Sequence, residues 1–359
     1  MNNQFDYNNN AFTITETALG IPGENVRESK RVSSRVHLSL FVYLLVTNAL
    51  MLIASIFLNI FLENTDNARV AEFIMGSTFS LLLGSVIQYV IAFPLLAFMM
   101  SALLRPRTYT KSKLSWKEYF FLLLIGEALM LAGSIVGNMI SETIGRFFRV
   151  TPENSVNTIV TETPLWAIIL TVCVLAPIFE ELIYRKLIMD RLGRLGGVVS
   201  VILSAAAFAL MHCNLYQIFY ALAVGVVFGY VYEKTHNVLY TISMHMILNF
   251  VGSVAVLPIM RASEKVTEMA ETVEAGGTVD EVSYYLNQML VSVYSLLTVA
   301  IIAVGITLFV LQLKKRGWKI LDDLGRPAPG TMKAAFANVG IILFIIFTGL
   351  LTVINLVFG

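Results

Sequence analysis

The chain has 359 residues, of which 57% are hydrophobic and 14% are charged, and its formal net charge is +1 at pH 7. Ordinary soluble domains carry about 25% charged residues, whereas the mean hydropathy here is +0.75, so the composition excludes that class and predicts an all-α, polytopic transmembrane helical bundle. The low net charge and the lack of a basic block argue against a nucleic-acid partner and leave membrane lipid as the expected surroundings.

The N-terminal third of the chain combines a polar tail with apolar runs. Residues 1–36 are polar and Asn-rich at their start, and we expect a disordered cytoplasmic tail there. A hydrocarbon core of about 30 Å needs about 20 apolar residues per helix. By this measure residues 37–155 form the N-terminal transmembrane helices, with spans predicted at roughly 38–62, 77–104 and 117–140.

The remaining apolar runs divide into a central and a C-terminal group. We expect residues 156–257 to form a functional core, because all the motifs described below lie there, and residues 258–359 to supply an external loop and the C-terminal transmembrane helices. Two runs of the core are short and nearly contiguous, so the total is about eight or nine spans. The spans are predicted at roughly 164–188, 198–213, 215–232, 238–257, 287–312 and 334–358.

Basic residues are distributed unevenly between the loops. If the N-terminus is cytoplasmic and every predicted span crosses, all the basic loops fall on the cytoplasmic side and the acidic or mixed loops on the other. We therefore expect a cell-membrane protein with its N-terminus inside. The basic residues of the tail and loops assigned to the cytoplasmic side are Arg27, Lys30, Arg31, Arg35, Arg105, Arg107, Lys111, Lys113, Arg191, Arg194, Lys234, Lys314, Lys315, Arg316, Lys319 and Arg326.

Two further polar features have no assigned role at this stage. The Glu-rich loop 262–286 is interpreted as a solvated, partly helical external loop. Glu127 lies within the apolar run "FLLLIGEALML", and both a structural hydrogen bond in the bundle and a functional polar path remain open for it.

The first motif places charged residues at the end of an apolar run. Glu180, Glu181 and Arg185 follow an uncharged stretch that begins at Thr163. A charge at the centre of a bilayer costs roughly 2.5–3.5 kcal/mol, so such residues usually have a partner or a function. Glu181 and Arg185 share a helix face and are predicted to form an ion pair. Glu180 points about 100° away, has no local counter-charge and is a candidate for proton transfer.

Two further motifs follow on separate spans. Phe208 and His212 are four residues apart at the end of a run that is rich in small residues, and His245 and Asn249 are four apart on the seventh run. Each histidine alone could be a structural hydrogen-bonding residue. Counting about 1.5 Å per residue from the cytoplasmic ends, however, places Glu180, His212, His245 and Asn249 at similar depths of roughly 10–21 Å.

A ridge of small residues lies between these two motifs. Ala221, Gly225 and Gly229 recur at four-residue spacing. Such a ridge lets neighbouring helices approach closely, and we interpret it as a packing surface rather than as part of a reactive site.

The four polar residues at matching depth suit peptide hydrolysis in a membrane-embedded pocket. A carboxylate beside an imidazole can activate water, and a histidine with an asparagine can stabilise the developing oxyanion. A divalent metal such as zinc, bound by Glu180, His212 and His245, is the alternative. The chain contains no H-E-x-x-H zinc motif and no G-x-S-x-G nucleophile elbow.

These motifs resemble those of a known family. "EELIYR" (180–185), "FALMH" (208–212) and "HMILN" (245–249), in this order, resemble the CPBP family of intramembrane proteases, as does "GVVFGYVYEKT" (225–235) before the last motif. The family includes the type II CAAX prenyl endopeptidases and bacteriocin-processing or self-immunity (Abi) proteins. The similarity covers about residues 160–257 and makes 156–257 a CAAX-protease-like catalytic core.

The resemblance implies a role for each matched residue. Glu180 would be the water-activating base, assisted by His212, and His245 with Asn249 would form the oxyanion site. Glu181, Arg185 and Phe208 would support them. The family has been described both as metal-dependent and as glutamate-type, so the resemblance leaves the cofactor open between no metal and a divalent metal such as zinc.

The expected function is therefore an intramembrane endopeptidase that acts on a peptide or a membrane protein. The main alternative is a non-catalytic membrane protein, either a bacteriocin self-immunity factor or one that stabilises a partner. A proton-coupled transporter is a third class, but it needs a polar path to both faces, of which only Glu127 and Gln88 are candidates.

Overall fold

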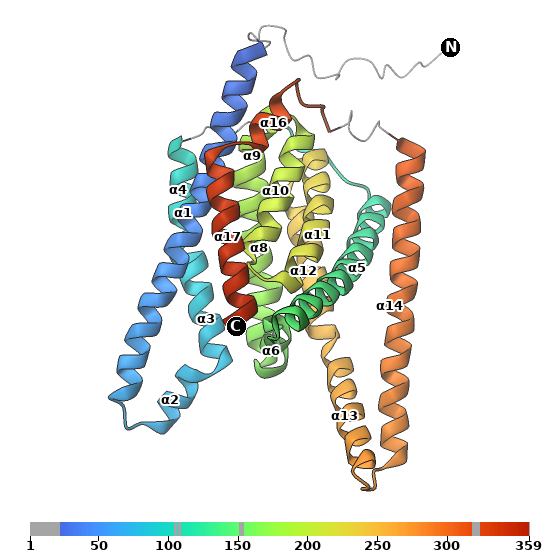
Figure 1. Ribbon diagram of the computed structural model, residues 1–359. Helices are drawn as coiled ribbons and strands as arrows, with labels where there is room; N and C mark the ends of the chain where they lie inside the picture. The colour runs from blue at the N-terminus through green and yellow to red at the C-terminus, as the bar shows by residue number, and fades with distance from the viewer. Residues whose placement is uncertain (1–21, 104–105, 107–108, 151–153, 318–323, 359) are drawn as a thin grey trace.

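The structure, a computed structural model, describes residues 22–103, 106, 109–150, 154–317 and 324–358. Within these residues every regular element is a helix, and the helices form one bundle (Figure 1). Eight helices are long and apolar enough to cross a membrane, and Gly197–Met211 is a shorter apolar helix. The prediction of an all-α, multi-pass membrane protein with about eight or nine spans is confirmed.

The first helix begins earlier than expected. α1 starts at Pro22, so residues 22–36, which we expected in the disordered tail, are helical. The reason is that Val32 and Val36 are fully buried in the main hydrophobic cluster, which ties this segment to the bundle. Residues 1–21 of the expected tail lie outside the described residues. The N-terminal group comprises α1 (Pro22–Glu63), α2 (Ala68–Met75), α3 (Ser77–Ser85) and α4 (Phe93–Leu103).

The central group contains the motifs. One continuous helix runs from α7 through α8 to α9, and α10 and α11 form a tight helical pair after it. Side-chain caps mark the N-termini of two helices. The Ser115 hydroxyl accepts a hydrogen bond from the Glu118 amide at the start of α5, and the Asn214 side chain accepts one from the Tyr216 amide at the start of α11. The elements are α5 (Trp116–Phe148), α6 (Ser155–Glu162), α7 (Leu165–Ile168), α8 (Ala176–Glu181), α9 (Asp190–Leu192), α10 (Gly197–Met211), α11 (Leu215–Thr235) and α12 (Val238–Phe250).

The C-terminal group extends well beyond the expected spans. α13 continues the α12 helix and covers the first half of the predicted external loop 262–286, which is therefore partly helical as expected. A turn at Gly276, where φ is 83°, leads into the next long helix. The elements are α13 (Leu257–Glu274), α14 (Glu281–Arg316), α16 (Thr331–Phe336) and α17 (Val339–Phe358).

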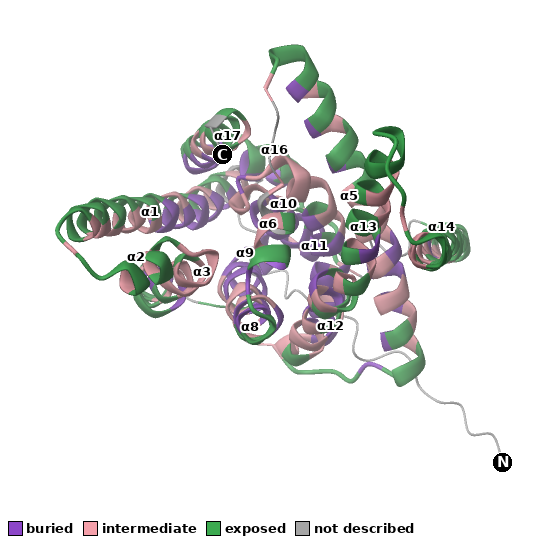
Figure 2. Cartoon of the chain, turned by 90° about the horizontal axis from the view of Figure 1, so that it is seen from below, coloured by how far each residue is buried: buried purple, intermediate pink, exposed green. Residues whose placement is uncertain are grey.

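The two ends of the bundle differ in the elements they carry. In Figure 1 the start of α1, the end of α4, α9, α16 and the end of α14 lie at the upper end, whereas α2, α6 and α13 lie at the lower end. Seen along the bundle in Figure 2, buried residues gather on α8 to α12, with α1 and α14 on opposite sides. The predicted basic segments next to these helices therefore share one end.

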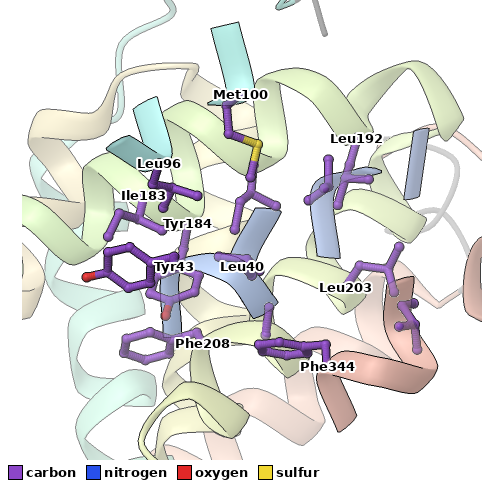
Figure 3. Packing of buried hydrophobic residues seen from close by; sticks show 14 of the residues in the cluster. Leu40, Tyr43, Leu96, Met100, Ile183, Tyr184, Leu192, Leu203, Phe208 and Phe344 are labelled. Atoms are coloured by element: carbon purple, nitrogen blue, oxygen red, sulfur yellow. The ribbon is translucent and has the colours of Figure 1, made fainter. Parts of the chain in front are cut away.

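A hydrophobic cluster joins the N-terminal, central and C-terminal groups. Leu40 and Tyr43 on α1 pack with Leu96 and Met100 on α4 and with Phe344 on α17 (Figure 3). The same cluster includes Tyr184 and Phe208 from the central group (Figure 3). Burial of such side chains contributes roughly 1.5–3 kcal/mol each, so the helix that carries the first motif is fixed against its neighbours.

Close helix approach also fixes α11. A Cβ on Gly225 would lie 3.1 Å from the Ala205 Cα, and one on Gly229 would lie 3.0 Å from the Val201 Cγ1. The interpretation of the small-residue ridge as a packing surface against α10 is confirmed. On another face of α11, a Cβ on Gly133 of α5 would lie 2.6 Å from the Tyr220 Cα.

Candidate active site

The candidate site surrounds a cavity of about 810 Å³ inside the bundle. Glu180, His212, His245 and Asn249 all line it, although they come from α8, the end of α10 and α12. Its volume lies within the roughly 300–1,000 Å³ typical of ligand pockets. The structure thus brings the residues of the three motifs together around one space.

Glu181 and Arg185 form the predicted ion pair. The Arg185 Nε donates to the Glu181 Oε2 at 3.0 Å, and both side chains have 0% exposure. The Arg185 Nη1 also donates to the Ser204 hydroxyl at 2.8 Å, and Ser204 in turn donates to the Tyr184 carbonyl at 2.9 Å. The pair is therefore locked in the core between the helix of the first motif and α10.

His245 lies between the two glutamates. Its Nδ1 is 3.1 Å from the Glu181 Oε1, and its Nε2 is 3.7 Å from the Glu180 Oε2. Because an ionised carboxylate can only accept, Nδ1 carries the proton in the contact with Glu181. Glu180 differs from Glu181 in its surroundings, since its side chain is 18% exposed and faces the cavity.

The ring of His212 has a defined tautomer. Its Nδ1 is 2.8 Å from the Phe208 carbonyl oxygen. A carbonyl can only accept, so Nδ1 is the donor, and the neutral ring keeps its lone pair on Nε2. This arrangement makes His212 a hydrogen-bond acceptor on the cavity wall.

Phe208 separates the two imidazoles. Its ring is edge-on to His212, with 5.0 Å between the centroids, and to His245, with 5.7 Å. The Arg185 guanidinium lies 5.5 Å from the Phe208 ring centroid, within the range of a cation–π contact. Phe208 therefore sets the spacing of the histidines and covers the buried ion pair.

Asn249 binds the backbone of a neighbouring helix. Its Nδ2 donates to the Val172 carbonyl at 2.8 Å. One residue along, the Cys173 Sγ is 3.5 Å from the Ser253 hydroxyl. Val172 and Cys173 belong to the π-helical segment Ile169–Leu175, and Ser253 belongs to the π-helical segment Val251–Ala255. The two segments lie side by side at the cavity.

A third π-helical segment at the cavity, Val86–Ala92, contributes Gln88 and Tyr89. These three cavity segments each end shortly before a proline, namely Pro94, Pro177 and Pro258, whereas the π-helical segment Leu182–Met189 has no proline after it. Proline has no N–H and clashes with the carbonyl of residue i−4, so the turn before it opens. Two amides just before the prolines, of Phe93 and Ala176, donate instead to the carbonyls of Gln88 and Thr171, five residues back.

The positions of the side chains bear on whether the candidate zinc ligands could bind a metal together. Within the described residues, no three His, Cys, Asp or Glu side chains are grouped as a metal-ligand set. Glu180, His212 and His245 do not form such a set in this arrangement, so the mechanism below has no step through a metal, and zinc binding stays a prediction.

Sequence reasoning missed several contacts of the site. It assigned Glu181 to Arg185 alone, whereas Glu181 also binds His245 from another helix, a contact that no spacing within one helix reveals. It also treated the spans as regular α-helices and missed the π-helical segments. The prolines inside the apolar runs were the available signal for them. Glu180 lines the cavity, as the helix geometry predicted for a carboxylate that points away from Arg185, whereas Glu127 is not among the residues lining this cavity.

A comparison with protein families agrees with the motifs. Residues 162–251 match the family model described as "Type II CAAX prenyl endopeptidase Rce1-like". The match covers all three motifs and confirms the resemblance to the CPBP family of intramembrane proteases for this segment. Such a family acts as a hydrolase on a peptide or protein substrate in the membrane. No curated protein and no solved structure matches the chain.

Proposed function

We propose that this protein is an intramembrane endopeptidase in which Glu180 and His212 activate a water molecule that hydrolyses a peptide bond of a peptide or membrane-protein substrate. One observation carries the proposal, namely the different surroundings of the two glutamates. Glu181 is fully buried and held by Arg185 and His245, whereas Glu180 faces the cavity with its carboxylate partly exposed. Glu180 is thus the carboxylate that can reach a bound water.

In the first step the water oxygen attacks the carbonyl carbon of the scissile bond. Glu180 accepts one proton of this water, and the lone pair on the His212 Nε2 accepts a hydrogen bond from it. The Nδ1–H of His212 stays on the Phe208 carbonyl and holds the ring in this tautomer. A positioned base of this kind contributes about 10²–10⁴-fold to a rate.

In the second step His245 and Asn249 stabilise the tetrahedral oxyanion. In this step His245 carries a proton on each ring nitrogen, so it donates to the oxyanion from Nε2 while Nδ1 donates to Glu181. Asn249 has a second amide hydrogen besides the one bound to the Val172 carbonyl. The C–N bond then breaks, the proton on Glu180 passes to the leaving nitrogen, and the products are a carboxylic acid and an amine.

The proposal includes an orientation in the cell membrane. Basic residues next to the helix ends are favoured on the cytoplasmic side, and the basic segments of this chain adjoin the helix ends that lie together in Figure 1. The N-terminus is then cytoplasmic, and α2, α6 and α13 lie on the other side.

Substitution of Glu180 by glutamine tests the proposal. We expect Glu180→Gln to lower peptide cleavage by about 10²–10⁴-fold, because glutamine keeps the shape but cannot accept the proton. The measurement is cleavage of a peptide pool by purified protein in lipid nanodiscs, followed by mass spectrometry, with a thermal melt as the folding check. Glu127→Gln is the matched control, since this intramembrane glutamate is not among the residues lining the cavity.

Two results would contradict parts of the proposal. Cleavage by Glu180→Gln at the rate of the unsubstituted protein would rule out Glu180 as the base. If cells with this variant also kept their protection against a bacteriocin, the non-catalytic self-immunity or partner-stabilising role would be favoured. Loss of cleavage after dialysis against a chelator, with recovery on adding zinc, would assign Glu180, His212 and His245 to a metal instead.

A further inference from the structure

Two tyrosines of the cavity wall approach Glu180 from different parts of the chain. Tyr89 belongs to the segment Val86–Ala92 between α3 and α4, and Tyr220 belongs to α11. Both line the cavity, and each lies close enough to Glu180 to interact electrostatically with its carboxylate. In Figure 1, α3 and α11 lie on opposite sides of α8, which carries Glu180. The two phenols therefore reach the region of the carboxylate from different walls.

The hydroxyl groups of both tyrosines are open to the cavity. Within the part of the chain that the structure describes, neither hydroxyl makes a hydrogen bond. Neither of them is among the fully enclosed polar atoms that lack a partner, so each is in contact with open space. Because Tyr89 and Tyr220 line the cavity, that space is the cavity. A phenol can donate and accept a hydrogen bond, so both groups are available to a molecule that binds there.

Packing fixes the position of each tyrosine. The Tyr89 ring stacks on the ring of Phe179, which directly precedes Glu180, with 4.7 Å between the centroids and 7° between the planes. The backbone of Tyr220 lies against Gly133 of α5, where an added Cβ would be 2.6 Å from the Tyr220 Cα. Groups that are held in place before binding lose little conformational freedom when a ligand binds to them.

A peptide in this cavity needs hydrogen-bond donors for more than one carbonyl. The proposed oxyanion donors, His245 and Asn249, serve the scissile carbonyl. The neighbouring carbonyls lie about one residue length away, since consecutive Cα atoms are about 3.8 Å apart. They lose their hydrogen bonds to water on binding, which costs free energy unless protein donors replace the water. The Glu180 carboxylate and the His212 Nε2 can only accept, whereas the two phenols can donate.

On the basis of the proposed function, we propose that Tyr89 and Tyr220 hold the substrate by donating hydrogen bonds to the two peptide carbonyls that precede and follow the scissile carbonyl, one tyrosine to each. The hydroxyls take no part in the proton transfers. They bind the peptide backbone and place the scissile carbonyl next to the water at Glu180.

Substitution by phenylalanine tests each hydroxyl, because it keeps the ring and its packing. We expect Tyr89→Phe and Tyr220→Phe each to raise the KM for a peptide about fivefold to tenfold, with kcat within about twofold, since each removes a binding contact and not a reacting group. The probe is the peptide of the pool that the unsubstituted protein cleaves fastest, measured with purified protein in lipid nanodiscs, and a thermal melt checks folding. Tyr285→Phe, on α14 and 66% exposed, is the matched control and should change neither constant.

A change in the peptide tests the same contacts from the side of the substrate. The probe peptide is made with an (E)-alkene in place of the amide that precedes or follows the scissile one, which removes one carbonyl and keeps the extended shape. We expect each alkene to raise the KM of the unsubstituted protein about fivefold to tenfold. In one of the two tyrosine variants the same alkene should have at most about a twofold further effect, because the hydroxyl that binds the missing carbonyl is already absent.

The outcomes separate this inference from the proposed function. An unchanged KM in either tyrosine variant, a fall in kcat without a change in KM, or alkene effects of equal size in all variants would overturn the inference and leave the endopeptidase in place. Cleavage by Glu180→Gln at the unsubstituted rate would overturn the proposed function instead. If the unsubstituted protein cleaves no peptide of the pool, fluorescence anisotropy with the labelled pool decides: binding that is at least about fivefold weaker in both tyrosine variants supports the inference, and equal or absent binding overturns it.

Discussion

At the scale of single residues, the most constrained group of the site is the chain from Ser204 through Arg185 and Glu181 to His245. Each link is a hydrogen bond between side chains that are nearly or fully buried. A buried ion pair costs much desolvation, and removal of one partner leaves the other charge uncompensated. The group therefore orients His245 for the proposed reaction and also ties three helices together.

This leads to a prediction for Arg185→Met. The substitution leaves the buried Glu181 carboxylate without its cation, so we expect the free energy of unfolding to fall by about 3–5 kcal/mol. The measurement is denaturant unfolding of the purified protein in detergent, followed by tryptophan fluorescence.

A pair with the same spacing supplies the control. Glu142 and Arg146 are also four residues apart, but their side chains are 61% and 84% exposed. Arg146→Met should therefore change the free energy of unfolding by less than about 1 kcal/mol. Equal effects of the two substitutions would show that burial does not set the strength of the Glu181–Arg185 pair.

Part of this residue-scale picture could be predicted from the sequence. The Glu181–Arg185 pair follows from spacing within one helix, and the pair is present. The contact between Glu181 and His245 joins residues of two different helices. It depends on how those helices rotate against each other, which local spacing does not determine.

At the scale of elements, the positions of the spans could be predicted from the sequence, but the π-helical segments within them were not. Apolar length locates a helix, and the described helices overlap all the predicted spans. Three described π-helical segments, Val86–Ala92, Ile169–Leu175 and Val251–Ala255, precede a proline, which removes a backbone donor, whereas a fourth, Leu182–Met189, does not. The short helices α2 and α6 lie in segments between the predicted spans, and α13 continues α12 into the loop 262–286, which was predicted to be partly helical.

The proline after the segment Ile169–Leu175 gives an element-scale prediction. In Pro177→Ala the new N–H can bond the Cys173 carbonyl, so the opened turn can tighten into a regular α-helix. The Val172 carbonyl would then move relative to Asn249, and Glu180 would rotate relative to His245. We expect kcat to fall at least about tenfold, in line with the sensitivity of catalysis to small misplacements, with little loss of thermal stability.

The control for this substitution is Pro329→Ala in an exposed loop outside the spans, which should leave kcat unchanged. The measurements are steady-state cleavage of the peptide pool by purified protein in lipid nanodiscs and a thermal melt. An active Pro177→Ala protein with unaltered kcat would show that the π-helical segment is not needed to place Glu180.

At the scale of the whole molecule, the cavity and the basic segments lie toward different ends of the bundle. The lining includes Asn157 and Thr158 of α6 and Ser77 at the start of α3, and in Figure 1 α6 lies at the end opposite the start of α1 and the end of α14. Under the proposed orientation, with a cytoplasmic N-terminus, the cavity would be accessible from the non-cytoplasmic side. The substrate segment would then enter from outside the cell.

Cysteine labelling tests this access route. The native Cys173 and Cys213 are free and buried, so replacement of both by serine gives a background for single cysteines. In intact cells, a membrane-impermeant maleimide should label Asn157→Cys, which is exposed on α6 and faces the outside in the proposed orientation. Lys113→Cys, exposed in a basic segment before α5, should react only after permeabilisation, because the positive-inside rule places it in the cytoplasm. The reverse pattern would invert the orientation and give the cavity a cytoplasmic opening, so the substrate would have to be sought among cytoplasmic or newly synthesised chains.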